Sequence, residues 1–162
     1  MTEPIRFEKN GRNTVVLAQQ YLPAPIDEVF AFFSDARNLE RITPKTVRFE
    51  ILTPEPIEMG VGTLIDYRLR IKGLPIRWRT RICEWDPPNR FADEQLKGPY
   101  HLWYHTHWFK QDGERTLIGD RIEYRPRGGP LINALFVKRD VKGIFTHRQK
   151  VLAEIFGEDG AS

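Results

Sequence analysis

Short segments that alternate apolar and polar residues fill most of the chain between residues 14 and 126. Each segment is rich in β-branched and aromatic residues and ends at prolines, glycines or Asp and Asn residues, which is the pattern of β-strands joined by turns. Strands with such short connections pair antiparallel. The predicted strands are Thr14–Leu22, Val47–Leu52, Thr63–Ile71, Ile76–Trp85, Phe91–Leu96, Tyr100–Phe109 and Thr116–Tyr124. The sequence therefore predicts an antiparallel meander sheet of about seven strands.

Two short helices are predicted after the first strand. Ile26–Phe33 has apolar residues at helical spacing and acidic residues in its first turn, where they complement the helix dipole. Ser34 or Asp35 can cap a second short helix that ends near Arg41. Residues 1–11 are polar without a period, and we expect a loose arm or an edge element there.

A long helix is predicted near the C-terminus. It begins at Pro130, because proline suits the first turn of a helix, and it ends near Phe156, before Gly157. Laid across the sheet, such a helix would cover the inner sheet face. Its apolar stripe is interrupted by Arg148 and consists of Leu131, Leu135, Val141, Ile144, Phe145, Leu152, Ile155 and Phe156.

The strand at residues 100–109 carries aromatic residues on both faces. Successive side chains of a strand point to opposite faces. Tyr100, Leu102, Tyr104, Thr106 and Trp108 are expected to share one face, and His101, Trp103, His105, His107 and Phe109 the other. Neither face can be freely exposed to water, so we expect the helix to cover one of them.

Asp112 and Gly113 predict a two-residue hairpin turn after this strand. That turn sets a register in which His105 lies opposite Asp120, close enough for an imidazole and a carboxylate to hydrogen-bond. A carboxylate on one imidazole nitrogen fixes the tautomer and leaves the other nitrogen as a base or a ligand. The full set of expected pairs is Gln111–Glu114, Phe109–Thr116, His107–Ile118, His105–Asp120, Trp103–Ile122 and His101–Tyr124.

Composition narrows the class of protein. A chain of 162 residues with 40% hydrophobic and 29% charged residues is expected to form a single globular domain over residues 1–162, with a core at about 14–156. No apolar run approaches the ~20 residues of a membrane span, and the N-terminus does not resemble a secretory signal, so we expect a cytoplasmic protein without stable membrane insertion. The net charge of +3 is mild and the basic residues are scattered, so no nucleic-acid partner is predicted. Cys83 is the only cysteine, which excludes an internal disulfide.

The order of elements resembles the helix-grip fold of the START-like superfamily, also called SRPBCC, which includes birch-pollen-allergen-like proteins, polyketide cyclases/aromatases and coenzyme Q-binding proteins. More narrowly, residues 85–91 (WDPPNRF) followed by Asp93, Gln95, 98–100 (GPY), Trp103, His105, His107 and Phe109 are similar to bacterial cyclase/dehydrase-like members. The resemblance covers about residues 14–156 and implies an α+β fold. It also implies a cavity between the sheet and the long helix that accepts an apolar or aromatic small molecule.

The predicted function is therefore binding or transport of a hydrophobic small molecule, such as a lipid, an isoprenoid or a polyaromatic compound. His105, His107 and Asp120 would supply polar anchors in an otherwise apolar pocket. The residues expected to contact the ligand are Tyr67, Trp78, Trp103, His105, His107, Ile122, Tyr124 and Arg148.

Several alternatives stay open at this point. The His and Asp residues can simply satisfy one another in the sheet. A cyclase or dehydratase would use His105 as acid/base with Asp120 behind it. His-x-His with Asp120 could bind a metal, but the apolar neighbours favour an organic ligand, so no metal and no cofactor are predicted. A protein partner is possible through Lys138, Arg139 and Lys142.

Overall fold

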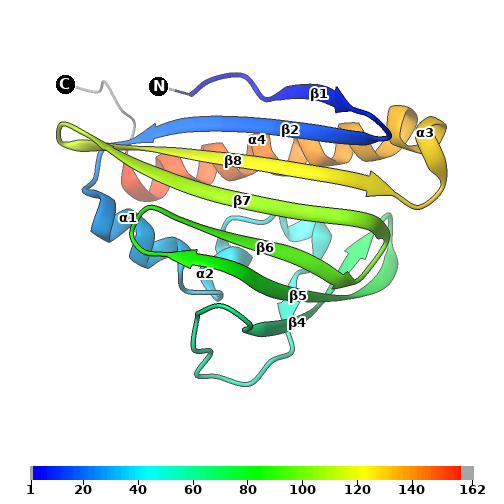
Figure 1. Ribbon diagram of the computed structural model, residues 1–162, viewed down its shortest axis with the longest axis horizontal. Helices are drawn as coiled ribbons and strands as arrows, with labels where there is room; N and C mark the ends of the chain where they lie inside the picture. The colour runs from blue at the N-terminus through cyan, green and yellow to red at the C-terminus, as the bar shows by residue number, and fades with distance from the viewer. Residues whose placement is uncertain (1, 158–162) are drawn as a thin grey trace.

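Eight antiparallel strands form one curved sheet, and a long C-terminal helix lies across one of its faces (Figure 1). The structure, a computed structural model, describes residues 2–157. The strand order is β1-β2-β8-β7-β6-β5-β4-β3, so β3 to β8 form a meander and β2 pairs with β8. The strands are β1 Arg6–Asn10, β2 Asn13–Leu22, β3 Glu50–Ile51, β4 Leu64–Ile71, β5 Leu74–Asp86, β6 Arg90–Lys97, β7 Tyr100–Asp112 and β8 Arg115–Pro126.

Two short helices follow β2, and a long helical segment follows β8. The helices are α1 Ile26–Phe33, α2 Asn38–Arg41, α3 Gly129–Ile132 and α4 Lys138–Phe156, with a 3₁₀ turn at Lys45–Val47 (η1) and a π-helical turn at Asn133–Val137 (η2). This is the α+β helix-grip architecture that the sequence predicts. Within residues 2–157, no helix is both long enough and apolar enough to cross a bilayer.

One edge of the sheet agrees with the prediction and the other differs from it. At residues 1–11, where we expect a loose arm or an edge element, β1 pairs along β2 as a largely exposed edge strand. The expected strand Val47–Leu52 shrinks to the two residues of β3, because a 3₁₀ turn occupies its start and Arg48 then adopts a left-handed conformation with φ +48°. That strand lies at the other edge, where few cross-strand pairs support it.

The C-terminal helix begins at Gly129, one residue before the predicted start, and contains a π-helical turn. The turn begins at Asn133, a buried residue held by the sheet. Asn133 Nδ2 donates to Thr14 Oγ1 at 3.1 Å, and Asn133 Oδ1 accepts from the Tyr124 hydroxyl at 2.9 Å. These bonds attach the start of the helical segment to β2 and β8, at the point where a π-helical turn interrupts the regular spacing.

The hairpin between β7 and β8 is centred one residue later than predicted. Its central residues are Gly113 and Glu114, and Gly113 has a φ of +62°. A positive φ at the first central position but not at the second is typical of a type II′ turn, whereas the prediction placed Asp112 and Gly113 at the centre.

Five of the six predicted cross-strand pairs are therefore wrong by two residues, and the sixth does not form, because His101 lies at the register shift between Tyr100 and Leu102. His107, not His105, lies directly opposite Asp120, and His105 lies opposite Ile122. Likewise Gln111 lies opposite Thr116, Phe109 opposite Ile118 and Trp103 opposite Tyr124. A shift of two residues keeps the side chains from Trp103 to Phe109 on their predicted faces, so His105 and Asp120 still share the inner face.

Two apolar clusters form the core, one toward each end of the sheet. One contains Trp78, Tyr124 and Phe145, and the other contains Phe30 and Phe91. The polar residues of β7 lie between them, so the sheet positions the histidines inside the molecule.

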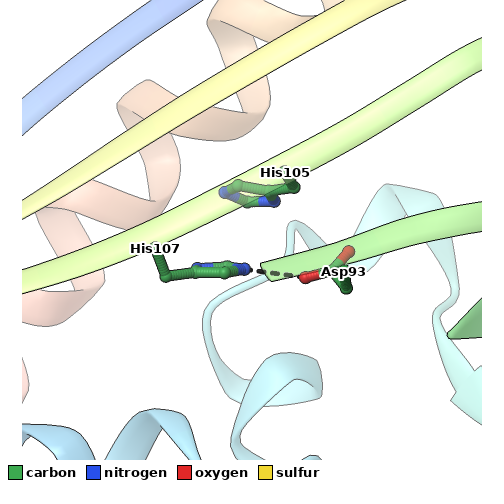
Figure 2. Close-up of side chains that lie close together, drawn as sticks. All are labelled: Asp93, His105 and His107. Atoms are coloured by element: carbon green, nitrogen blue, oxygen red, sulfur yellow. Dashed lines mark hydrogen bonds and ion pairs between the residues drawn. The ribbon is translucent and has the colours of Figure 1, made fainter. Parts of the chain in front are cut away.

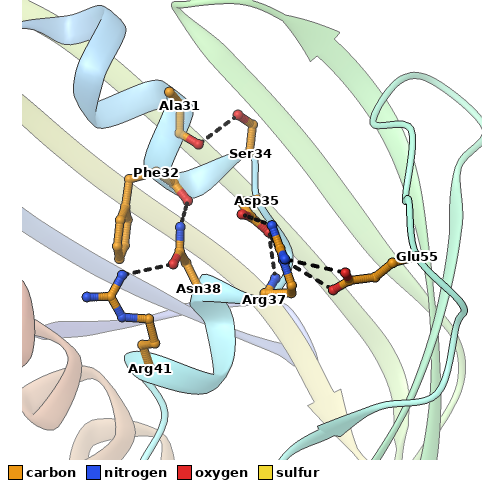
Figure 3. Close-up of polar contacts among 8 residues, drawn as sticks. All are labelled: Ala31, Phe32, Ser34, Asp35, Arg37, Asn38, Arg41 and Glu55. Carbon is orange, nitrogen blue, oxygen red and sulfur yellow. Dashed lines mark hydrogen bonds and ion pairs between the residues drawn. The ribbon is translucent and has the colours of Figure 1, made fainter.

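The short segment that joins α1 to α2 is fixed by polar contacts (Figure 3). Arg37 pairs with Asp35 at 3.0 Å and with Glu55 at 3.2 Å, which links this segment to the loop before β4. Asn38 Nδ2 donates to the Phe32 carbonyl at 2.9 Å, and Arg41 Nη1 donates to Asn38 Oδ1 at 3.1 Å. The second helix begins at Asn38 and is shorter than the predicted helix from Ser34 or Asp35.

Candidate functional site

A cavity of about 940 Å³ lies between the inner face of the sheet and α4. Most of its wall is apolar, and α1, α2 and the β4–β5 turn contribute to its rim. The predicted ligand-contact residues that line it are Tyr67, Trp78, Trp103, His105, His107 and Arg148. Ile122 and Tyr124 are fully buried in the core and do not line it. Asp120 does not line it either and contacts the two histidines.

The aromatic wall includes Tyr100, which the alternation of β7 had placed on the outer face. A register shift between Tyr100 and Leu102 breaks the alternation, so Tyr100 turns inward and His101 is exposed. The Tyr100 ring lies 4.7 Å from Trp103 and 5.6 Å from Trp78. A bulge of this kind has no clear signal in one sequence, because Gly98 and Pro99 mark only the preceding turn.

Two histidines and two aspartates form a polar cluster at the cavity wall. His105 Nε2 donates to Asp120 Oδ1 at 2.7 Å, so the predicted contact forms diagonally across the strands. His107 Nε2 donates to Asp93 Oδ2 at 2.8 Å (Figure 2). His107 Nδ1 lies 3.2 Å from Asp120 Oδ1 as an ion pair, without the geometry of a hydrogen bond. The two imidazole rings stack 3.7 Å apart.

Asp93 is the member of the cluster whose contact the sequence did not reveal. It lies on β6 directly opposite His105, and its hydrogen bond goes to the neighbouring His107. The sequence did show that Phe91 and Asp93 share one face of a predicted strand. The register between that strand and β7 could not be predicted from the turn alone. Phe91 stacks on the other side of His107, with ring centroids 4.2 Å apart.

The two histidines have different pKa values because their surroundings differ. Burial lowers the pKa of His105, and the nearby charge of His107 lowers this pKa further, against the opposing effect of Asp120. Burial also opposes protonation of His107, but its contacts with Asp120 and Asp93 outweigh burial and raise its pKa. Between these two pKa values His105 is neutral and His107 is a cation. Since Asp120 only accepts, the neutral His105 carries its proton on Nε2 and has a lone pair on Nδ1.

Arg148 on α4 brings a second positive charge to the cluster. It is 6% exposed, and its Nη2 lies 3.5 Å from Asp120 Oδ1. Burial raises the pKa of Asp120, but Arg148 and then the histidines more than offset this and hold the pKa well below its usual range. Burial likewise opposes ionisation of Asp93, but the hydrogen bond from His107 lowers its pKa. Two anions and two cations therefore balance when His107 is protonated.

Among residues 2–157, Asp93, His105 and His107 form a group that could hold a metal ion, with ligand atoms within 4.8 Å of one another. Asp93 and His107 already hydrogen-bond each other, so an ion would have to replace that bond. Asp120, the third ligand considered from the sequence, is not part of this group and accepts a hydrogen bond from His105 Nε2. The expectation that no metal is bound stays a prediction.

The outer basic residues lie away from this cluster. Lys138, Arg139 and Lys142 are exposed near the start of α4, and Arg139 also reaches the rim of the cavity. Binding of a protein partner through these three residues stays a prediction.

The family model described as "Polyketide cyclase / dehydrase and lipid transport" matches residues 22–145. No curated protein matches the chain. Solved structures share its fold at low sequence identity. They include a protein from Chromobacterium violaceum (16% identity, TM-score 0.71, covering 90% of this chain and 98% of that one). Another is the ginseng major latex-like protein 151 from Panax ginseng (13%, 0.67, 90% and 99%). A third is the Zhui aromatase/cyclase from a Streptomyces species (19%, 0.62, 88% and 96%).

Proposed function

Because the chain belongs to the polyketide cyclase/dehydrase and lipid transport family, we propose that it binds a hydrophobic small molecule, such as a lipid, an isoprenoid or a polyaromatic compound. The observation that carries the proposal is the cavity of about 940 Å³. This volume lies in the range of small-molecule sites, roughly 300–1,000 Å³. An apolar body would contact Tyr67, Trp78 and Trp103, while the histidine end of the cavity would receive a polar group.

The test is direct binding by the purified protein. Native mass spectrometry would reveal a ligand retained from expression, and titration with the neutral fluorophore Nile red would report an accessible apolar cavity. We expect one bound fluorophore per chain with increased emission. Tyr67→Ala should weaken binding because it removes part of the wall, whereas Tyr21→Ala, on β2 away from the cavity, should not. Protein that stays free of ligand against a broad panel of lipophiles would contradict the proposal.

A second candidate function is a cyclase or dehydratase, and the asymmetric histidine pair favours it. The neutral His105 offers a lone pair on Nδ1, while His107 holds a proton, so a base and an acid lie side by side. In a dehydration, His105 would remove the proton from the carbon next to a carbonyl. His107 would protonate the β-hydroxyl as it leaves as water, and a conjugated double bond would form.

This candidate is tested with a β-hydroxy ketone carrying an aromatic group, whose dehydration product absorbs at longer wavelength. We expect His105→Ala and Asp120→Asn to abolish turnover and to leave the fold intact by circular dichroism. If the natural chain and both variants bind the ketone but none of them dehydrates it, the enzymatic candidate is contradicted and non-catalytic binding remains. If both variants only lower the melting temperature, the cluster has a structural role.

A further inference from the structure

We propose that the ligand is an acid, with an apolar body in the cavity and a carboxylate held by the Arg148 guanidinium. This inference rests on the proposed binding function and specifies the chemical class of the ligand. It is drawn from the contacts that Arg148 makes and from those it lacks.

Arg148 lines the cavity and is 6% exposed. A guanidinium has five N–H donors, and buried donors are almost always hydrogen-bonded. Among residues 2–157, no acceptor forms a hydrogen bond with Arg148, and its buried Nε has no partner at all. The side chain therefore presents unsatisfied donors at the wall of a cavity large enough for a ligand.

The balance of charge with Asp120 does not account for this geometry. An arginine kept only to neutralise a buried carboxylate is expected to bind it in a bidentate manner at about 2.8 Å. Here the closest approach is 3.5 Å, and the same oxygen of Asp120 already accepts from His105 at 2.7 Å. Asp120 thus already accepts a hydrogen bond from a residue of the sheet, and the donors of Arg148 can bind another acceptor.

Two aromatic rings hold the guanidinium in place. The Arg148 carbon Cζ lies 5.1 Å from the centre of the Phe33 ring and 5.4 Å from that of Phe145. Both rings also line the cavity. A cation fixed between apolar rings combines a polar anchor with a hydrophobic surface, which suits an amphiphile better than a fully polar anion.

A carboxylate fits this anchor better than a phosphate. A single arginine can bind one carboxylate with two parallel hydrogen bonds. Asp93 and Asp120 lie in the same cluster and would repel a dianion more strongly than a monoanion. His105 is neutral, so it can compensate the incoming negative charge by taking up a proton. It lies next to His107 and Asp120 on the sheet side and next to Phe145 on the helix side.

The experiment compares two ligands that share one body. Pyrenebutyric acid and pyrenebutanol carry the same polyaromatic group and differ in the carboxylate, and both are followed by pyrene fluorescence. We expect the natural chain to bind the acid about tenfold more tightly than the alcohol, the range of a charge-assisted hydrogen-bond pair. If the acid does not bind more tightly than the alcohol, including the case in which neither binds, the inference is overturned.

Variants assign the preference to Arg148. Arg148→Met should bind acid and alcohol equally, and Arg148→Lys should keep only part of the preference because an ammonium cannot bind a carboxylate in the bidentate manner. Arg139→Met, at the exposed rim of the same cavity, is the matched control and should keep the preference. Loss of the preference in the Arg139 variant alone would overturn the assignment. Binding of the alcohol and of Nile red tests the proposed function independently of the preference for the acid. The proposed function fails only if no lipophile binds.

Discussion

His105 and His107 lie two residues apart on one strand, yet their surroundings favour opposite protonation states. Each is buried, and each hydrogen-bonds a carboxylate. The difference is that His107 lies between two carboxylates, whereas His105 has one and stacks on the charged ring of its neighbour. Residue type alone could not have told these two histidines apart, because their pKa values depend on the charges of Asp93 on β6 and Asp120 on β8.

The difference in pKa between the two histidines gives a first prediction. In an NMR titration of the four histidines, we expect His107 to titrate above the ordinary value of 6.5 and His105 below it. Assignment uses the single variants His105→Gln and His107→Gln. In His107→Gln the pKa of His105 should rise, because the neighbouring positive charge is gone. Two buried histidines that titrate together near 6.5 would contradict this picture.

A second residue-scale prediction concerns Gly119. It lies directly opposite Trp108, and a Cβ at this position would collide with the indole ring. We expect Gly119→Ala to lower the free energy of unfolding by about 1–3 kcal/mol, as overpacking does. Urea denaturation measures the change. In a Trp108→Val background the same substitution should cost much less, and an equal cost in both backgrounds would show that the ring is not the cause.

At the scale of elements, the hairpin of β7 and β8 shows what a turn motif can and cannot define. Asp112 and Gly113 correctly indicated a tight hairpin, but the glycine occupies the first central position, not the second. The register moved by two residues and all six predicted pairs changed. Because side chains alternate with a period of two, the side chains from Trp103 to Phe109 kept their predicted faces, and the contact between His105 and Asp120 formed as a diagonal one.

The helix α4 gives a third prediction. Gly143 lines the cavity, and a Cβ there would meet no atom within 4 Å. We expect Gly143→Trp to reduce Nile red binding by narrowing the cavity, without lowering the melting temperature, since replacing a helical glycine removes a cost of up to ~1 kcal/mol. The control is Thr146→Trp, at an exposed position of the same helix outside the cavity lining. Unchanged fluorophore binding in the Gly143 variant would argue against binding beside α4.

At the scale of the whole molecule, the buried cluster makes stability depend on pH in both directions. The lowered pKa values of Asp93 and Asp120 stabilise the fold above about pH 3.8, and this contribution is lost as the pH falls through their folded values. The lowered pKa of His105 acts in the same direction below 6.5, because the unfolded chain then binds a proton that the folded chain does not. The raised pKa of His107 stabilises the fold below 6.5, and this is lost as the pH rises through its folded value.

The fourth prediction uses these signs. Urea denaturation at a series of pH values should show stability falling below pH 6.5, with His105 contributing at most about 1.4 kcal/mol per pH unit. His105→Gln should flatten this part of the profile, whereas His107→Gln should remove a loss above pH 6.5. His101→Gln, at an exposed position outside the cluster, is the control. A profile that is the same in all three variants would contradict the assignment.

Local sequence patterns were enough to predict the order of the elements, the two faces of β7 from Trp103 to Phe109 and the long helix with Arg148 in its apolar stripe. These features rest on local periodicity and on turn residues, which act between neighbours in the chain. Three features were visible only in the folded protein: the single-residue bulge that turns Tyr100 inward, the contact of Asp93 with His107, and the unpaired Nε of Arg148. Each depends on how strands and the helix from distant parts of the chain pack against one another. The residue pattern within one segment does not indicate which other segment it will contact.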